Sequence, residues 1–181
     1  TPGWWDQIVG PGRIIDTERY YVVAANVLGG CQGSTGPASL APDGAPWGSR
    51  FPVISTRDQV RAEALLSDLL GIHTWDIVVG TSLGGHRAIE WAVSYPERVR
   101  RLVVVASGAQ TTADQAAWTH TQIRAIELDP AWRGGDYYAG PGPTAGLALA
   151  RQIAHTTYRS PSELDERFGR IPQNDEDPLH G

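Results

Sequence analysis

The residues best placed to do chemistry lie in the segment 80–85, which reads GTSLGG. This segment follows an apolar run at 75–79 and opens a helical pattern of apolar residues at 84–95. A Gly-x-Ser-x-Gly sequence between a strand and a helix is typical of a sharp turn that carries a nucleophilic serine. The spacing therefore predicts that Ser82 is a nucleophile for acyl transfer, held at the carboxyl edge of a sheet, where ligands of α/β domains bind.

The same turn makes predictions about its backbone. The residues two before and two after the serine should almost touch, so we expect that neither Gly80 nor Gly84 could carry a Cβ atom. Ser82 should adopt a strained conformation, at a cost of about 1–3 kcal/mol. The N–H group of Leu83, at a helix N-terminus, should point at the negative charge that develops on the acyl oxygen. The alternative is a glycine-rich turn with a purely structural role.

Other chemistries find little support in the sequence. The glycines at 29–33 lack the spacing of a dinucleotide-binding loop, and a chain without lysine has no Walker A motif. Because there is no His-Glu-x-x-His motif and no pair of cysteines, we expect no metal site. The single cysteine, Cys31, excludes an internal disulfide and favours a reducing compartment. It reads as a small loop residue, with a reactive thiol as the alternative.

A serine nucleophile needs a histidine base and a carboxylate that orients the base. The positions of the five histidines favour packing or surface roles: His73, His86, His120, His155 and His180. In proteins with this serine turn, the acid and the base follow later strands, and we expect no strand after residue 110. We therefore predict that the base and its carboxylate are missing from this chain, which would be inactive by itself.

Three apolar runs predict strands that are buried on both faces, at 20–28, 75–79 and 102–106. Two helices should separate them, and the second is the pattern at 84–95. The first should run to about residue 70 from a capping box formed by Thr56 and Gln59, with Gly71 as its left-handed stop. Its apolar face should consist of Val60, Ala64, Leu65 and Leu69. This order predicts a parallel sheet with right-handed crossovers.

After residue 110 the sequence predicts only helices, at 112–128, 144–157 and 161–168. Ser160 should cap the last of them, with a proline at its first position. An acidic loop at 173–178 should follow. We therefore predict an α/β fold in two parts, namely a partial sheet domain at 1–110 and a helical lid insertion with an acidic tail at 111–181.

Charge and hydropathy restrict the possible partners. The net charge of −5 argues against nucleic acid, because there is no basic excess to neutralise phosphates. No apolar run approaches the length of about eighteen residues that suggests a membrane-spanning helix, so we expect no membrane partner. The first residues read as a loop, and we expect the chain to be a piece of a larger protein. The remaining part of the same fold, or another chain, should then cover the edges of the sheet.

The sequence resembles the homoserine O-acetyltransferases, a family with the α/β-hydrolase fold. The matching stretches follow one another along nearly the whole chain: GWWD at 3–6, GPG at 10–12, DT at 16–17, NVLGGC at 26–31, GSTGP at 33–37, RD at 57–58, EW at 90–91, YP at 95–96, DP at 129–130, GGDY at 134–137, LAR at 149–151 and TYR at 157–159. Family members are longer, and this chain resembles their middle. The resemblance implies a partial sheet of the α/β-hydrolase type, followed by a helical lid.

The resemblance also implies a reaction. Acetyl-CoA, as a substrate and not a bound cofactor, would acetylate Ser82, and the hydroxyl group of homoserine would then accept the acetyl group. In the family an arginine on the insertion helix holds the carboxylate of the amino acid; Arg151 matches it, and Tyr158 matches a nearby tyrosine. The alternatives are a surface arginine packed along its helix and a tyrosine in the core of the insertion. The implied enzyme is cytoplasmic, belongs to methionine biosynthesis and is expected to be a homodimer.

The serine turn departs from the family pattern, which usually reads Gly-Gly-Ser-Met-Gly, because Thr81 and Leu83 flank the serine here. The difference leaves donor and acceptor open. Relatives with this scaffold use a succinyl donor, or serine or a deacetylated cephalosporin as acceptor, and an esterase of the same fold uses water. The remaining alternative is a catalytically incomplete fragment that acts as a scaffold.

Overall fold

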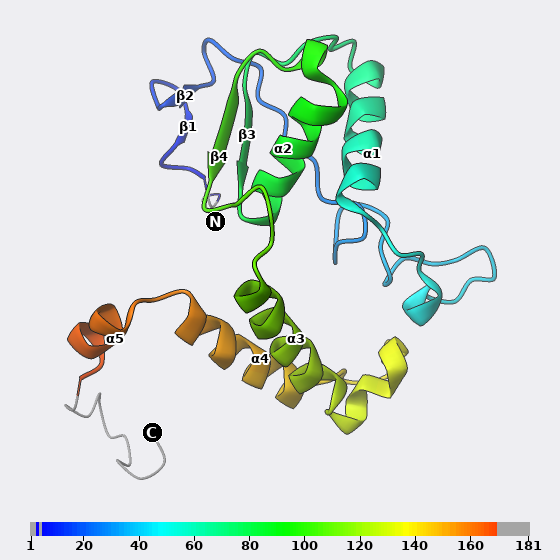
Figure 1. Ribbon diagram of the computed structural model, residues 1–181. Coiled ribbons are helices and arrows are strands. Elements are labelled where there is room, and N and C mark those ends of the chain that lie inside the picture. Colours follow the sequence, from blue (N-terminus) through cyan, green and yellow to red (C-terminus); the bar gives the residue numbers. More distant parts are fainter. Residues whose placement is uncertain (1–2, 4, 170–181) are drawn as a thin grey trace.

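The computed structural model describes residue 3 and residues 5–169 (Figure 1). Its longer elements are α1 (Thr56–Leu69), β3 (Val78–Thr81), α2 (Leu83–Ser94), β4 (Leu102–Val105), α3 (Ala113–Glu127), α4 (Thr144–Thr157) and α5 (Pro161–Arg167). Its short elements are β1 (Val9–Gly10), β2 (Ile15–Asp16), and the 3-10 turns η1 (Gly48–Arg50), η2 (Pro96–Arg98) and η3 (Pro130–Gly135). Within the described residues, no helix combines the length and the apolar character needed to cross a membrane.

Strands β3 and β4 form a parallel pair that helix α2 connects. Their register runs from the pair Val78 and Leu102 to the pair Thr81 and Val105. Helices α1 and α2 pack against each other and lie on one side of the strands, whose carboxyl ends point toward α3 and α4 (Figure 1). The predicted strand–helix–strand unit is therefore confirmed, with β3 slightly later in the sequence than expected.

The core lies between α1, α2 and the strand pair. Its centre is formed by Val60, Ala64 and Trp91, and burial of a valine contributes about 1.5–3 kcal/mol. Two residues of the expected apolar face of α1, Leu65 and Leu69, are instead exposed, because the buried stripe continues from Val60 and Ala64 to Ser67. The Ser67 hydroxyl donates to the carbonyl oxygen of Glu63, and so its burial leaves no donor unpaired.

The strands are less buried than the sequence predicted. Val79, Leu102, Val103 and Val105 expose between 37% and 48% of their surface. A parallel strand is buried on both faces only where helices cover both faces. Among the described residues, α1 and α2 cover one face alone, so the prediction of fully buried strands is wrong for β3 and β4.

The strand predicted at 20–28 does not form within the described part of the chain. Tyr21 is 75% exposed and Val22 is 40% exposed, although both were expected to be buried. A strand requires a neighbour that pairs with its N–H and C=O groups, and no described strand pairs with this run. Its apolar composition was sufficient to suggest a strand but could not supply the partner.

Helix α1 begins with a capping box that is one residue earlier than predicted. Ser55, and not Thr56, is the N-cap: its Oγ accepts a hydrogen bond from the Asp58 N–H (3.2 Å), and the Asp58 carboxylate accepts one from the Ser55 N–H (3.0 Å). An aspartate thus takes the role that the prediction gave to Gln59. The left-handed stop at Gly71 is confirmed by its φ of +71°.

Helices α3 and α4 pack closely where the glycine at position 146 meets α3. A Cβ atom on Gly146 would lie 2.6 Å from the carbonyl oxygen of Ala125. The carboxylate of Asp129 accepts hydrogen bonds from the N–H groups of Gly146 and Ala131, both at 2.9 Å, and these bonds lower its pKa. The end of α3 and the start of α4 are therefore held together by backbone contacts as well as by side chains.

The helical part, α3 to α5, follows β4 through residues 106–112 (Figure 1). Asp136, which follows η3, forms a second link between the helical part and η1. Its carboxylate accepts hydrogen bonds from the N–H and the hydroxyl of Ser49, both at 2.8 Å. The three predicted helices are confirmed, as is the Ser160 cap of α5. The acidic loop predicted at 173–178 lies outside the described residues.

Candidate active site

Ser82 occupies the turn between β3 and α2 with a backbone conformation that is rare for a residue with a side chain. Its φ is 51° and its ψ is −121°, a combination that costs about 1–3 kcal/mol and persists only where the surrounding structure holds it. The residue is exposed, and its hydroxyl forms no hydrogen bond within the described part of the chain. The strained, exposed serine that the sequence predicted is therefore present.

Of the two glycines that the sequence predicted to need the absence of a side chain, only one is confirmed. A Cβ atom on Gly80 would overlap the carbonyl oxygen of Gly84 and would lie 2.8 Å from the nitrogen of Gly85, so Gly80 must lack a side chain. The same prediction is wrong for Gly84, where a Cβ atom would meet nothing within 4 Å. The second required glycine is Gly85, because a Cβ atom there would lie 2.6 Å from Cβ of Ser107.

The first N–H groups of α2 face away from the helix body. The carbonyl oxygen of Ser82 accepts hydrogen bonds from Gly85 (2.9 Å) and His86 (3.2 Å). Neither Leu83 nor Gly84 donates its N–H to any group in the described residues. A helix N-terminus with free N–H groups carries partial positive charge and favours a nearby anion.

The sequence did not predict two hydrogen bonds that join Ser82 to the end of the neighbouring strand β4. The Ser82 N–H donates to the carbonyl oxygen of Val105 at 3.0 Å. The Ser107 hydroxyl donates to the carbonyl oxygen of Ser82 at 2.6 Å. Because a serine shortly after a strand has no sequence signature, the only available signal was the expected adjacency of the two strand ends.

No described histidine hydrogen-bonds to Ser82. His86 is half-buried one turn along the same helix, and His73 lies before β3, where its carbonyl oxygen accepts a hydrogen bond from Arg98. His120 and His155 are exposed on α3 and α4, while His180 lies outside the described residues. The described residues also contain no cluster of three or more His, Cys, Asp or Glu side chains that could hold a metal ion. A base for Ser82 stays unassigned.

The two residues expected to bind substrate lie on and at the end of α4. Arg151 is exposed and has no ion-pair partner among the described residues, unlike Arg124, which pairs with Glu127 on α3. Tyr158 caps the helix C-terminus and is 75% exposed, so it does not pack in a core here. Residues seven apart lie on one face of a helix, so both side chains are presented on the same side.

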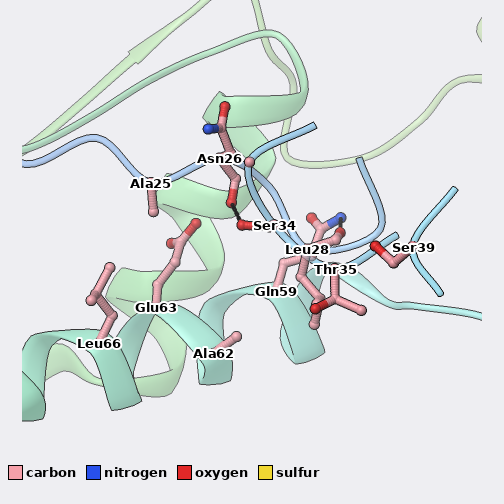
Figure 2. A pocket seen from close by; sticks show the side chains of 11 residues that line it. Ala25, Asn26, Leu28, Ser34, Thr35, Ser39, Gln59, Ala62, Glu63 and Leu66 are labelled. Carbon is pink, nitrogen blue, oxygen red and sulfur yellow. Dashed lines mark hydrogen bonds between the residues drawn. The ribbon is translucent and has the colours of Figure 1, made fainter. Parts of the chain in front are cut away.

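A hollow lies elsewhere in the described structure. It has a volume of about 610 Å³ between residues 25–39 and helix α1 (Figure 2). The side-chain amide of Gln59 donates a hydrogen bond to the carbonyl oxygen of Leu28 at 3.2 Å. The carboxylate of Glu63 accepts a hydrogen bond from the indole N–H of Trp91 at 2.7 Å. None of the predicted site residues lines this hollow.

The geometry of the turn agrees with a comparison against known protein families. The family model described as alpha/beta hydrolase fold matches residues 3–180, which is nearly the whole chain. The chain belongs to the alpha/beta hydrolase fold family. Proteins of this fold carry their nucleophile in a strand-to-helix turn, and the strained Ser82 lies in a turn of this kind between β3 and α2.

Relatives within the alpha/beta hydrolase family include acyltransferases and esterases. The homoserine O-acetyltransferase of Thermobifida fusca is 62% identical over 183 aligned residues, which cover 100% of this chain and 48% of that protein. The crystal structure of homoserine O-acetyltransferase from Bacillus anthracis has a TM-score of 0.87 and 33% identity, over 96% of this chain and 48% of that one. The crystal structure of esterase E22 has a TM-score of 0.88 and 35% identity, over 100% of this chain and 52% of that one.

These comparisons confirm the resemblance that the sequence motifs suggested. They also show that the chain spans about half the length of the curated relatives it matches.

Proposed function

We propose that the protein that carries these residues is a homoserine O-acetyltransferase, which moves the acetyl group of acetyl-CoA to the hydroxyl of homoserine in methionine biosynthesis. The observation that supports this most strongly is the 62% identity to the Thermobifida fusca homoserine O-acetyltransferase across the entire chain. The free cysteine Cys31 is exposed, which fits a reducing compartment, and we place the reaction in the cytoplasm.

The proposed reaction has two steps. In the first, Ser82 Oγ forms a bond to the acetyl carbon of acetyl-CoA, the carbon–sulfur bond breaks, and CoA leaves with a proton as the thiol. In the second, the homoserine hydroxyl attacks the acetyl-serine, O-acetylhomoserine leaves, and the proton returns to Ser82. The free N–H of Leu83 is proposed to stabilise the oxyanion in both steps.

Binding of homoserine is proposed for Arg151 and Tyr158. A guanidinium group suits a carboxylate because it can donate two parallel hydrogen bonds, and Arg151 has no competing partner among the described residues. Tyr158 follows Arg151 by seven residues, about two helical turns, and its hydroxyl is proposed to complete the subsite. We further propose that the remaining part of the same fold, or a second copy in a homodimer, covers the exposed strands β3 and β4.

Substitution of Arg151 by alanine should raise the KM for homoserine by about 10- to 100-fold, because a hydrogen-bonded charge pair contributes about 1.5–3 kcal/mol. The rate of Ser82 acetylation, measured as the burst of CoA release without homoserine, should not change. Arg124→Ala is the control, since it removes an exposed, ion-paired arginine from the neighbouring helix. A slower burst with an unchanged KM would contradict the assignment.

A serine esterase is the second candidate, because esterase E22 matches the whole chain with a TM-score of 0.88. The two functions differ in the fate of the acetyl-enzyme. We expect a mass increase of about 42 Da on Ser82 after addition of acetyl-CoA, and rapid loss of this mass only when homoserine is added. Serine, deacetylated cephalosporin and succinyl-CoA test the other acceptors and the other donor. Hydrolysis as fast as transfer at saturating homoserine would favour the esterase.

A further inference from the structure

Two strained residues lie at the carboxyl ends of the neighbouring strands. Among the described residues, three that are not glycine have a positive φ, and two of them are Ser82 (φ 51°) and Ala106 (φ 53°). Strands β3 and β4 are paired up to Thr81 and Val105, so each strained residue directly follows the last pair. A pair of rare conformations at one sheet edge requires local contacts that hold both of them.

The contacts come from the residues on either side of Ala106. The carbonyl oxygen of Val105 accepts the Ser82 N–H at 3.0 Å, and the hydroxyl of Ser107 donates to the Ser82 carbonyl oxygen at 2.6 Å. The Ser82 N–H is therefore bound to the β4 side. The Ser82 carbonyl oxygen, which also accepts the Gly85 and His86 N–H groups of α2, is bound to that side by Ser107. If Ala106 continued the strand, Ser107 would move onward by about 3.3 Å per residue and would lose this contact.

Gly85 provides the space in which Ser107 reaches the turn. A Cβ atom at position 85 would overlap Ser107 Oγ and would lie 2.6 Å from its Cβ. The absence of a side chain at this one position thus lets the hydroxyl approach the start of α2. Ser107 is itself half-buried, whereas Ser82 is exposed.

The carbonyl oxygen that Ser107 holds belongs to the same peptide group as the Leu83 N–H. A peptide group is planar and rigid, so fixing the direction of the Ser82 C=O also fixes the direction of the Leu83 N–H. This N–H is the group that has no other partner among the described residues. A hydroxyl far from Ser82 in the sequence is thereby linked to the direction of the donor next to the nucleophile.

We propose that Ser107 is a positioning residue, which aims the Leu83 N–H at the acyl oxygen by holding the Ser82–Leu83 peptide group. The proposal rests on the proposed function only in that Ser82 acts as a nucleophile. Ser107 acts on the transition state and not on substrate binding, because its hydroxyl is directed to backbone carbonyl oxygens, that of Ser82 at 2.6 Å and that of Val105 at 3.2 Å.

The test uses Ser107→Ala in the protein that carries these residues. A fluorophosphonate probe serves as the readout: Ser82 Oγ bonds to phosphorus, the phosphorus–fluorine bond breaks, and fluoride and the serine proton leave. The phosphoryl oxygen that the probe already carries occupies the oxyanion position. We expect the maximal labelling rate to fall about tenfold, which corresponds to one lost hydrogen bond. The concentration for half-maximal rate and the midpoint of the pH–rate profile should not change, since Ser107 does not act on the base. Ser107→Thr keeps the hydroxyl and should recover most of the rate.

Ser94→Ala is the matched control, because the Ser94 hydroxyl makes a bond of equal length, 2.6 Å, to Glu90 at the other end of α2. An unchanged labelling rate in Ser107→Ala, a shifted pH midpoint, or an equal loss in Ser94→Ala would overturn the proposal. A wild-type Ser82 that reacts with the probe but not with acetyl-CoA would overturn the proposed function and leave the role of Ser107 standing. A folding defect in Ser107→Ala is separated from this role by its melting temperature and by Ser107→Thr.

Discussion

Replacement of Ser82 by alanine is expected to abolish acetyl transfer, with a fall in kcat of about 10⁴- to 10⁶-fold, the range seen when a nucleophile of this kind is removed. In the proposed reaction the hydroxyl is the attacking group, and alanine has no group that could replace it. Stability should change by less than about 0.5 kcal/mol, because the hydroxyl makes no hydrogen bond in the described structure. The release of CoA and the mass of the protein after acetyl-CoA measure the effect.

The control for this variant is again Ser94→Ala, which removes a serine hydroxyl from the same helix but from its far end. It should transfer acetyl groups at the wild-type rate. If Ser82→Ala still became acetylated at a single site, the nucleophile would be another residue, and both the acyl-serine reaction and the role of the turn would have to be abandoned.

Replacement of Gly80 by alanine is expected to have the largest effect on stability, with a loss of about 3 kcal/mol or more. The added Cβ atom would overlap the backbone of α2 at Gly84 and Gly85. A backbone cannot move aside as a flexible side chain can, and overpacking typically costs about 1–3 kcal/mol even where rearrangement is possible. Urea unfolding followed by circular dichroism measures the change.

Gly84→Ala is the matched variant, because it adds the same atom four residues away. Its Cβ atom would meet nothing within 4 Å, and alanine is favoured over glycine in a helix by up to about 1 kcal/mol. We therefore expect Gly84→Ala to be neutral or stabilising. The motif alone predicts equal damage at both positions, so equal destabilisation would refute the geometry described for the turn.

Sequence reasoning located the elements that carry their own local signals. The turn at Ser82, the stop at Gly71 and the cap at Ser160 each depend on a few adjacent residues, and all three are present in the structure. The helices after residue 110 follow from the same kind of local pattern. These signals work because the backbone conformation at a turn or cap is restricted by the residue types at that position.

What sequence reasoning missed depends on contacts between distant residues. The run at 20–28 has the composition of a strand, but pairing also requires a neighbour. The requirement for glycine at position 85 and not at position 84 depends on which way α2 faces β4, which no motif encodes. The contact between Ser107 and Ser82 spans 25 residues. Arg151 was proposed as a binding residue only because it matches the corresponding family residue.

The positive φ of Ser82 has a consequence for how such a protein changes over generations. Glycine adopts this conformation without penalty, whereas serine does not, so the position that we propose serves catalysis is one at which the folded state gains from a mutation. A lineage maintained only for heat resistance should therefore drift toward glycine at position 82 and become more robust while it loses its chemistry. If Ser82 is the nucleophile that we propose, serine at this position costs thermostability and favours turnover.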